Sequence, residues 1–238
     1  HTVDLFAWQT GGEIVAAKGI GGYHLLVDAA SNTAVSRLRE RKRRTHKPFA
    51  VMIPSLEAAR AVCELDGLEA RLLASAQAPI VLASRRSSSR EHVAEVVAPG
   101  NPDLGIMLPY APLYHVLMRD FGGPIVATSG NLAEEPICTA EADALTRLGA
   151  IADVFLVHDR RIARPIDDSV VRVMAGQELV LRRSRGYAPL PVARGLDVAP
   201  AIAVGGHLKN SLAVAVGGDL ILGQHIGDLD SPVSREHQ

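Results

Sequence analysis

The sequence contains few cysteines and few aromatic residues. Its two cysteines are Cys63 and Cys138, and aromatic residues make up 4% of the 238 positions. Two cysteines argue against a disulfide framework and against a cysteine-based zinc site, so we expect buried thiols in a reducing compartment. Because aromatic residues are rare, aliphatic residues and alanine must build the core. The hydrophobic content of 47% is enough for one.

Long apolar runs and targeting signals are also missing. No run reaches the length of a membrane-spanning helix, and no signal peptide is visible. The chain begins with His1 in place of an initiator methionine. We therefore expect a piece of a longer cytoplasmic protein that makes no membrane contact.

Several catalytic motifs are absent. The sequence has no GxxxxGKS/T phosphate loop, no HExxH, no paired CxxC and no GxSxG elbow. Hydrolase and zinc-enzyme functions therefore have little support, and we expect no metal site built from protein ligands.

What the sequence does contain is a local concentration of positive charge. The net charge of the whole chain is −1, so this cluster is not part of a general basic excess. Such a cluster suits an anionic ligand such as a polyphosphate, and the alternative is a solvated basic helix end. The basic residues of this stretch, which are opposed only by Glu40, are Arg37, Arg39, Arg41, Lys42, Arg43, Arg44 and Lys47.

The residues around the cluster predict how its cations are arranged. Asn32 is expected to cap a helix that ends near Arg43. Pro48 disfavours helical geometry at the residue before it, and an apolar strand follows over residues 49–53. The cations that would converge from the helix end and from the extended segment are Lys42, Arg44 and Lys47.

A glycine-rich turn lies closer to the N-terminus. Two predicted strands, 13–18 and 24–28, flank the sequence GIGGY. The glycines permit either a hairpin turn or a close approach of a ligand to backbone amides. Lys18, at the end of the first strand, is a candidate phosphate contact, with an ordinary surface lysine as the alternative.

Polar residues follow a later strand, 124–128. Ser129, Gly130 and Asn131 stand at its carboxyl end, which is where open α/β sheets bind ligands. Serine and asparagine can hydrogen-bond a phosphate or a ribose, and glycine lets the backbone come close. A capped turn is the alternative.

A mixed-charge segment spans residues 158–169, and a second basic cluster begins at Arg182. Asp167 and Asp168 could hold arginines or a Mg²⁺ ion. A salt-bridged loop is the alternative for this segment.

Other local patterns complete the expected fold. We expect a helix over 139–149 capped by Thr139, an exposed loop over 84–92 and a strand over 93–98. Pro189, Pro191 and Pro200 indicate a linker. Beyond residue 200 the pattern of strands at 201–204, 208–216 and 219–222 predicts an added hairpin or the truncated start of a second domain, because about forty residues cannot bury a core.

Six segments together resemble the YrdC-like domain of the HypF family, the carbamoyltransferases of hydrogenase maturation. They read KGIGGYHL, LRERKRRTHKPFAVM, LGIMLPYAPLYHVL, ATSGN, HDRRIARPIDDSVVRV and LRRSRGYAPLPV. Their joint presence and order are specific. The tail segments AVGGHLKNSLAVAV and GQHIGDLDSP resemble the start of that family's next domain, an actin-like-ATPase-related carbamoyl-transfer domain.

The resemblance implies an α/β fold in two parts. Residues 1–195 are expected to form a YrdC-like twisted mixed sheet with helices and an open basic concave face. Residues 196–238 are expected to form a linker and a truncated, β-hairpin-like tail from the second domain.

The resemblance also implies a reaction. This domain is expected to make carbamoyl-adenylate from ATP, with Mg²⁺, and carbamate, releasing pyrophosphate. In the whole family protein the carbamate comes from carbamoyl phosphate, and the carbamoyl group passes to HypE for the cyanide ligands of the nickel–iron site. The family's acylphosphatase domain and zinc fingers have no counterpart in this sequence, so we expect neither efficient use of carbamoyl phosphate nor a completed transfer.

The family motifs carry over to single residues. Lys42 and Arg44 match the K-x-R pair and are expected to act in catalysis, and Ser129 and Asn131 match the S-x-N motif and are expected to bind ATP and the adenylate. Further expected ATP contacts are Lys47, Ser169, Arg183 and, from its position beside the glycine turn, Lys18.

Two other functions remain open on the sequence. One is a threonylcarbamoyl-adenylate synthase for tRNA modification, which would release pyrophosphate with bicarbonate and threonine. The other is a non-enzymatic module that binds double-stranded RNA through the basic concavity. For the leading hypothesis we expect Lys42→Ala or Arg44→Ala to weaken ATP binding with little loss of stability, because both side chains are expected to face solvent.

Overall fold

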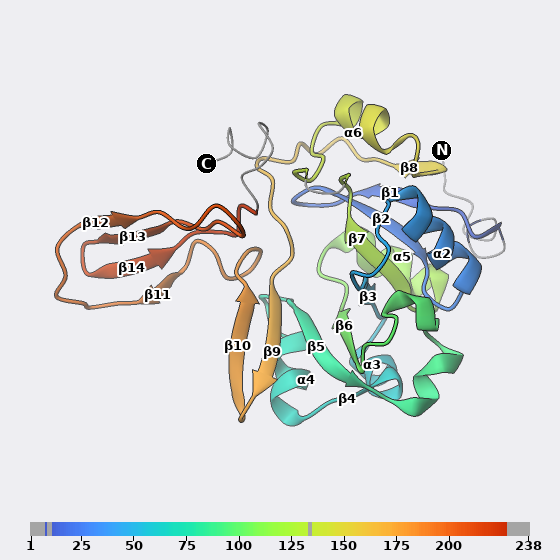
Figure 1. The fold of residues 1–238 in the computed structure, drawn as a ribbon, viewed down its shortest axis with the longest axis horizontal. Helices are drawn as coiled ribbons and strands as arrows, with labels where there is room; N and C mark the ends of the chain where they lie inside the picture. Colours follow the sequence, from blue (N-terminus) through green and yellow to red (C-terminus); the bar gives the residue numbers. More distant parts are fainter. Residues whose placement is uncertain (1–7, 9–10, 133–134, 228–238) are drawn as a thin grey trace.

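The computed structural model describes residue 8, residues 11–132 and residues 135–227. Within these ranges the chain forms a ten-stranded sheet with helices and a separate four-stranded sheet, which extends to one side of the main body (Figure 1). The expected α/β fold with a mixed sheet and a β-structured tail is confirmed.

The large sheet mixes parallel and antiparallel pairs. Its strand order is β10-β9-β5-β6-β3-β7-β2-β1-β8, with β4 attached to β5. The pairs β1–β8, β3–β6 and β5–β9 are parallel, and the other pairs are antiparallel. The strands are β1 (Val15–Lys18), β2 (Tyr23–Asp28), β3 (Ala50–Met52), β4 (Cys63–Glu64), β5 (Ile80–Arg85), β6 (Asp103–Met107), β7 (Ile125–Ser129), β8 (Val154–Leu156), β9 (Val170–Met174) and β10 (Gln177–Arg182).

Apolar side chains cover both faces of this sheet. Successive residues of a strand point to opposite faces, so in β2 Tyr23, Leu25 and Val27 join one cluster and Leu26 joins the other. Four helices pack on the first face, and α5 packs on the second together with Trp8. The helices are α2 (Asn32–Arg41), α3 (Leu56–Val62), α4 (Gly67–Leu73), α5 (Pro112–Phe121) and α6 (Glu141–Leu148). None of the described helices combines the length and apolarity that a membrane span needs.

Helix α2 places the basic stretch. Its buried residues Ala34, Val35 and Leu38 face the core. Ser31, and not Asn32, is the N-cap, because its side chain accepts a hydrogen bond from the backbone N–H of Ala34 at 3.2 Å. The helix ends at Arg41 with Lys42 as C-cap, two residues before the predicted end.

Two further cap and strand predictions were wrong. Helix α6 begins at Glu141 with Ala140 as N-cap and no side-chain cap bond, so Thr139 does not cap it. The apolar run 93–98 contains a 3₁₀ helix, Glu95–Val97, in place of a strand. Its backbone turns back on itself, because the N–H of Val97 donates to the carbonyl of Ala94 at 3.1 Å.

The segment 84–92 is ordered structure and not an open loop. Strand β5 continues to Arg85, and a 3₁₀ helix follows over Ser87–Glu91. Ser89 is fully buried and accepts a hydrogen bond from Nε of Arg85 at 2.7 Å.

The tail sheet begins earlier than the sequence predicts. Its order is β11-β14-β13-β12, and its strands are β11 (Pro191–Ala193), β12 (Ala201–Ala203), β13 (Ala213–Val216) and β14 (Asp219–Leu222). Strand β11 lies in the segment expected to be a linker. The strand predicted over 208–216 is shorter, because Asn210 and Leu212 make only isolated backbone hydrogen bonds, with residues 226–227 and with Gly223.

Candidate functional site

A cavity of about 580 Å³ lies between the large sheet and the tail. It is lined by the α2–β3 connection, the carboxyl end of β7, the segment before β9 and part of the tail around residues 224–227. Ala50, Ile80 and Ala127 line it from strands β3, β5 and β7. The charged side chains among its described lining residues are six cations and three carboxylates: Lys42, Arg43, Arg44, Lys47, Arg182 and Lys209, and Glu135, Asp167 and Asp168.

Lys42 is buried and holds the Ser129–Asn131 loop. Its side-chain amine donates to the carbonyl of Ser129 at 2.7 Å, the carbonyl of Asn131 at 2.6 Å and Oδ1 of Asn131 at 2.8 Å. The residue is 4% exposed, so the expectation that it faces solvent is wrong. Burial, with a smaller contribution from Arg44, lowers the pKa of Lys42 to about 7, while the three oxygen acceptors favour its charged form. Replacing Lys42 by alanine would leave these oxygens without a donor, so we now expect a loss of stability.

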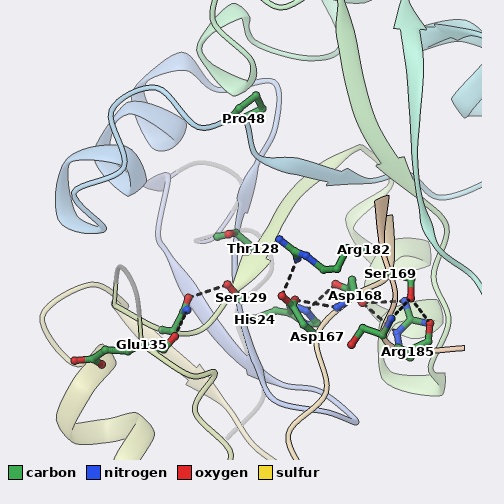
Figure 2. A network of polar contacts seen from close by, with 12 residues as sticks. His24, Pro48, Thr128, Ser129, Glu135, Asp167, Asp168, Ser169, Arg182 and Arg185 are labelled. Carbon is green, nitrogen blue, oxygen red and sulfur yellow. Dashed lines mark hydrogen bonds and ion pairs between the residues drawn. The ribbon is translucent and has the colours of Figure 1, made fainter. Parts of the chain in front are cut away.

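Ser129 and Asn131 lie together at the end of β7. The hydroxyl of Ser129 donates to Oδ1 of Asn131 at 2.8 Å, and Nδ2 of Asn131 donates to the carbonyl of Glu135 at 2.6 Å (Figure 2). The Asn131 side chain therefore bridges the strand end, Lys42 and the following loop. The structure brings together the two pairs that the sequence analysis singled out, and all four residues line the cavity.

Arg44 lines the same cavity from the extended segment. Its guanidinium donates to the carbonyls of Lys47 at 3.1 Å and Pro48 at 2.5 Å, and more weakly to Oγ1 of Thr128 at 3.5 Å. It also lies over the ring of Phe49, 5.0 Å from the centroid. Burial lowers the pKa of Arg44 to about 10, with further lowering from Arg39 and Arg182.

Lys47, from the same segment as Arg44, and Arg182, from the end of β10, add further positive charge. Partial desolvation of its ammonium, followed by the charges of Arg44 and Arg182, lowers the pKa of Lys47, although the residue is exposed. Arg182 donates to Oδ2 of Asp167 at 2.7 Å (Figure 2). The sequence analysis placed Arg182 in its second basic cluster but did not select it as a site residue, since the pairing of β9 with β5 that brings it here is not visible locally.

Three of the predicted contacts do not line the cavity. Lys18 is buried and donates to Oε1 of Glu141 at 2.7 Å and to the carbonyl of His158 at 2.9 Å. Ser169 is fully buried, donates to the carbonyl of Arg185 and accepts from the N–H of Ser184.

Arg183 is the third predicted contact that does not line the cavity. Its guanidinium donates to the carbonyl of Leu222 in the tail at 3.1 Å and to the carbonyls of Tyr187 and Leu190. Its own carbonyl accepts from the N–H of His225. In this arrangement Lys18, Ser169 and Arg183 stabilise the architecture around the cavity.

A buried ionic network, which the sequence analysis missed, supports one wall. Oδ1 of Asp168 accepts from Arg185 at 2.9 and 3.1 Å, and Oδ2 lies 3.2 Å from Nε2 of His24 (Figure 2). Nδ1 of His24 lies 2.5 Å from the hydroxyl of Tyr114, and Arg185 lies over the ring of Tyr110 at 3.5 Å. Burial alone would raise the pKa of Asp168, but the hydrogen bond with His24 and the Arg185 guanidinium hold it well below its usual range.

Asp167 and Asp168 thus hold arginines, one of the two roles expected for them. In the part of the chain that the structure describes, no group of three or more His, Cys, Asp or Glu side chains is placed to hold a metal ion. The arrangement therefore favours a phosphate-bearing ligand held by cations and by a hydroxyl/amide pair.

The mixed sheet and its cationic cavity define a YrdC-like α/β protein. The family model for Sua5, YciO and YrdC proteins, described as "Telomere recombination", matches residues 8–184. The chain belongs to this family, and the predicted resemblance is confirmed. A second model, described as the HypF Kae1-like domain, matches residues 197–238.

Curated relatives match almost the whole chain but are much longer. The carbamoyltransferase HypF of Synechocystis sp. is 49% identical over 221 residues, which is 92% of this chain and 29% of that protein. The carbamoyltransferase HypF of Rhodobacter capsulatus is 47% identical over 228 residues, which is 94% of this chain and 30% of that protein. The chain thus spans about 30% of the length of these relatives.

Solved structures of HypF and Sua5 proteins also match this chain. A full-length HypF in its phosphate- and nucleotide-bound form matches with a TM-score of 0.90 and 44% identity, covering 96% of this chain and 36% of that one. P. abyssi Sua5 complexed with L-threonine matches with a TM-score of 0.67 and 19% identity over 81% of this chain and 57% of that one, which supports the fold alone.

Proposed function

We propose that this chain binds ATP in the cavity and forms carbamoyl-adenylate from carbamate with release of pyrophosphate. The observation that carries the proposal is the convergence of Lys42, Arg44, Ser129 and Asn131 on one cavity. The similarity to HypF carbamoyltransferases, one of them solved with nucleotide and phosphate, supports the same assignment. A volume of about 580 Å³ lies within the range of small-molecule sites.

The chemistry would require positioning and charge stabilisation. A carbamate oxygen attacks the α-phosphorus of ATP, the bond from that phosphorus to the β-bridging oxygen breaks, and the electron pair leaves with pyrophosphate. Cations around the leaving group offset the negative charge that develops on it. Lys42 fixes the Ser129–Asn131 loop before the nucleotide arrives, which lowers the cost of ordering it on binding. A Mg²⁺ ion would arrive with the nucleotide, because the described residues offer no cluster of metal ligands.

The test is exchange of labelled pyrophosphate into ATP. We expect exchange that depends on carbamate, supplied as the ammonium salt. We expect Arg44→Ala to reduce it about tenfold or more, because a charge-assisted contact contributes about 1.5–3 kcal/mol. Arg119→Ala is the matched control, since Arg119 is an exposed arginine on α5 whose ion pair is with its neighbour Asp120. It should leave exchange unchanged.

Other outcomes would point to other functions. Exchange that needs threonine and bicarbonate, and ignores carbamate, would favour a threonylcarbamoyl-adenylate synthase. Binding of double-stranded RNA that weakens steeply with salt and needs no ATP would favour an RNA-binding module. The transfer of the carbamoyl group to HypE remains a proposal for the longer protein.

A further inference from the structure

Apart from Lys209, the lysine and arginine residues that line the cavity fall into two groups. In the first group the donors are already committed to protein oxygens. Lys42 has three oxygen acceptors for its three possible donors, and Arg44 donates to two carbonyls and a hydroxyl. Arg182 is paired with Asp167. A ligand that uses these groups must compete with bonds that already exist.

The second group consists of Arg43 and Lys47. Both line the cavity and both are exposed. Within the described residues, the Arg43 guanidinium and the Lys47 ammonium make no hydrogen bond and no ion pair. A ligand in the cavity can therefore take up the five N–H donors of Arg43 without displacing a contact with the described residues.

The backbone of Arg43 is unusual. Its φ is 52°, in the left-handed region. The N–H of Arg43 donates to the carbonyl of Glu40 at 3.0 Å, and the N–H of Arg44 donates to the carbonyl of Arg39 at 2.9 Å. This pair of bonds closes helix α2 as a Schellman motif, in which the left-handed position is usually glycine because a side chain is strained there.

The Schellman closure fixes the backbone of Arg43, but its exposed side chain, which has no hydrogen-bond or ion-pair partner among the described residues, is available to a ligand of the cavity that Arg43 lines. The exposed edge of the cavity is also where a leaving group must depart. Carbamate and the α-phosphate would then lie deeper, near Lys42 and the Ser129–Asn131 loop.

We infer that Arg43, together with Lys47 of the same cavity lining, binds the β- and γ-phosphates of the nucleotide and receives the departing pyrophosphate. This inference rests on the proposed function and adds a residue that lies between the two members of the K-x-R pair. The guanidinium suits a diphosphate because its planar donors can bond two phosphate oxygens at once.

Arg43→Gly separates the two roles of the residue. Glycine removes both the strain and the charge, so the melting temperature should rise by about 2–4 °C. Affinity for ATP and for inorganic pyrophosphate, measured by calorimetry, should fall about tenfold, while affinity for AMP should stay unchanged. Ala175→Gly is the matched control, because Ala175 is an exposed residue with φ of 50° in the β9–β10 turn, away from the cavity lining. It should stabilise the protein without changing any of the three affinities.

The outcomes are distinguishable. If wild-type protein binds ATP and Arg43→Gly binds it equally well, the inference fails and the proposed function stands. If Arg43→Gly weakens AMP as much as ATP, Arg43 does not act on the distal phosphates and the inference also fails. If wild-type protein binds none of the three ligands, both proposals fail.

Discussion

In the large sheet all four residues of β1 and five of the six residues of β2 are buried, whereas all three residues of β12 in the tail sheet are exposed. Apolar clusters cover both faces of the large sheet, but Ile202 in β12 is 76% exposed. The tail is held by its own strand pairing and by polar contacts such as those of Arg183. The cavity therefore has one wall, on the large sheet, that a hydrophobic core supports, and another wall, on the tail, that a few hydrogen bonds hold in place.

The largest expected effect concerns the ionic network behind the core-supported wall. Asp168→Ala should destabilise the protein by about 3–5 kcal/mol, because it leaves Arg185 buried without its carboxylate. Urea unfolding followed by circular dichroism measures the change. Asp159→Ala, an exposed aspartate of the same segment, is the control and should change stability little. A loss below about 1 kcal/mol for Asp168→Ala would mean that this wall is as loosely supported as the tail.

A matched pair of apolar truncations tests the comparison directly. Leu25→Ala, at a fully buried position of β2, should cost about 2–5 kcal/mol. Ile202→Ala, in β12, should change the free energy of unfolding by less than about 0.5 kcal/mol, because the Ile202 side chain is mostly exposed and buries little apolar area on folding. Thermal unfolding of the two variants beside wild type gives both values. Similar losses would show that the tail has a core of its own.

Much of the large sheet could be predicted from sequence, because its strands carry strong local patterns. Strands β2 and β7 lie within one residue of the predicted ranges 24–28 and 124–128. In the tail, β14 has the predicted bounds and β12 lies within one residue of prediction, but β11 was not predicted. Strand β11 is three residues long and has a proline at its start, so only its pairing with β14 defines it.

Residues that line the cavity could be predicted where their side-chain type and their place in the chain both pointed to it, and not elsewhere. Lys42 and Ser129–Asn131 were selected by type and spacing, and the structure joins them through three hydrogen bonds. The direction of the Lys18 side chain was not predictable, because its partner Glu141 is 123 residues away. The left-handed backbone of Arg43 was not predictable, because nothing in a run of basic residues distinguishes a left-handed position from a helical one.

The smallest expected effect is a pH dependence at the core-supported wall. Lys42 owes its lowered pKa of about 7 mainly to burial, which the exposed Arg43 side of the cavity lacks. A bound anion favours the charged form of lysine and so raises this pKa. Binding is then strongest below pH 7, where Lys42 is already charged, and weakens as the pH rises through the pKa of the complex. Between pH 7 and pH 8.5 we expect ATP affinity to fall about threefold to tenfold, with proton uptake visible by calorimetry in buffers of different ionisation heat.

Lys42→Met decides whether this dependence belongs to Lys42. Methionine has a similar length and cannot titrate, so the variant should bind ATP more weakly at pH 7 and show a flatter pH profile. ATP itself titrates near neutral pH, but it contributes equally to wild type and variant, so the difference between the two profiles isolates the lysine. If both profiles have the same slope, Lys42 remains charged throughout. Its three oxygen acceptors would then outweigh its burial, and the two walls of the cavity would not differ in their response to pH.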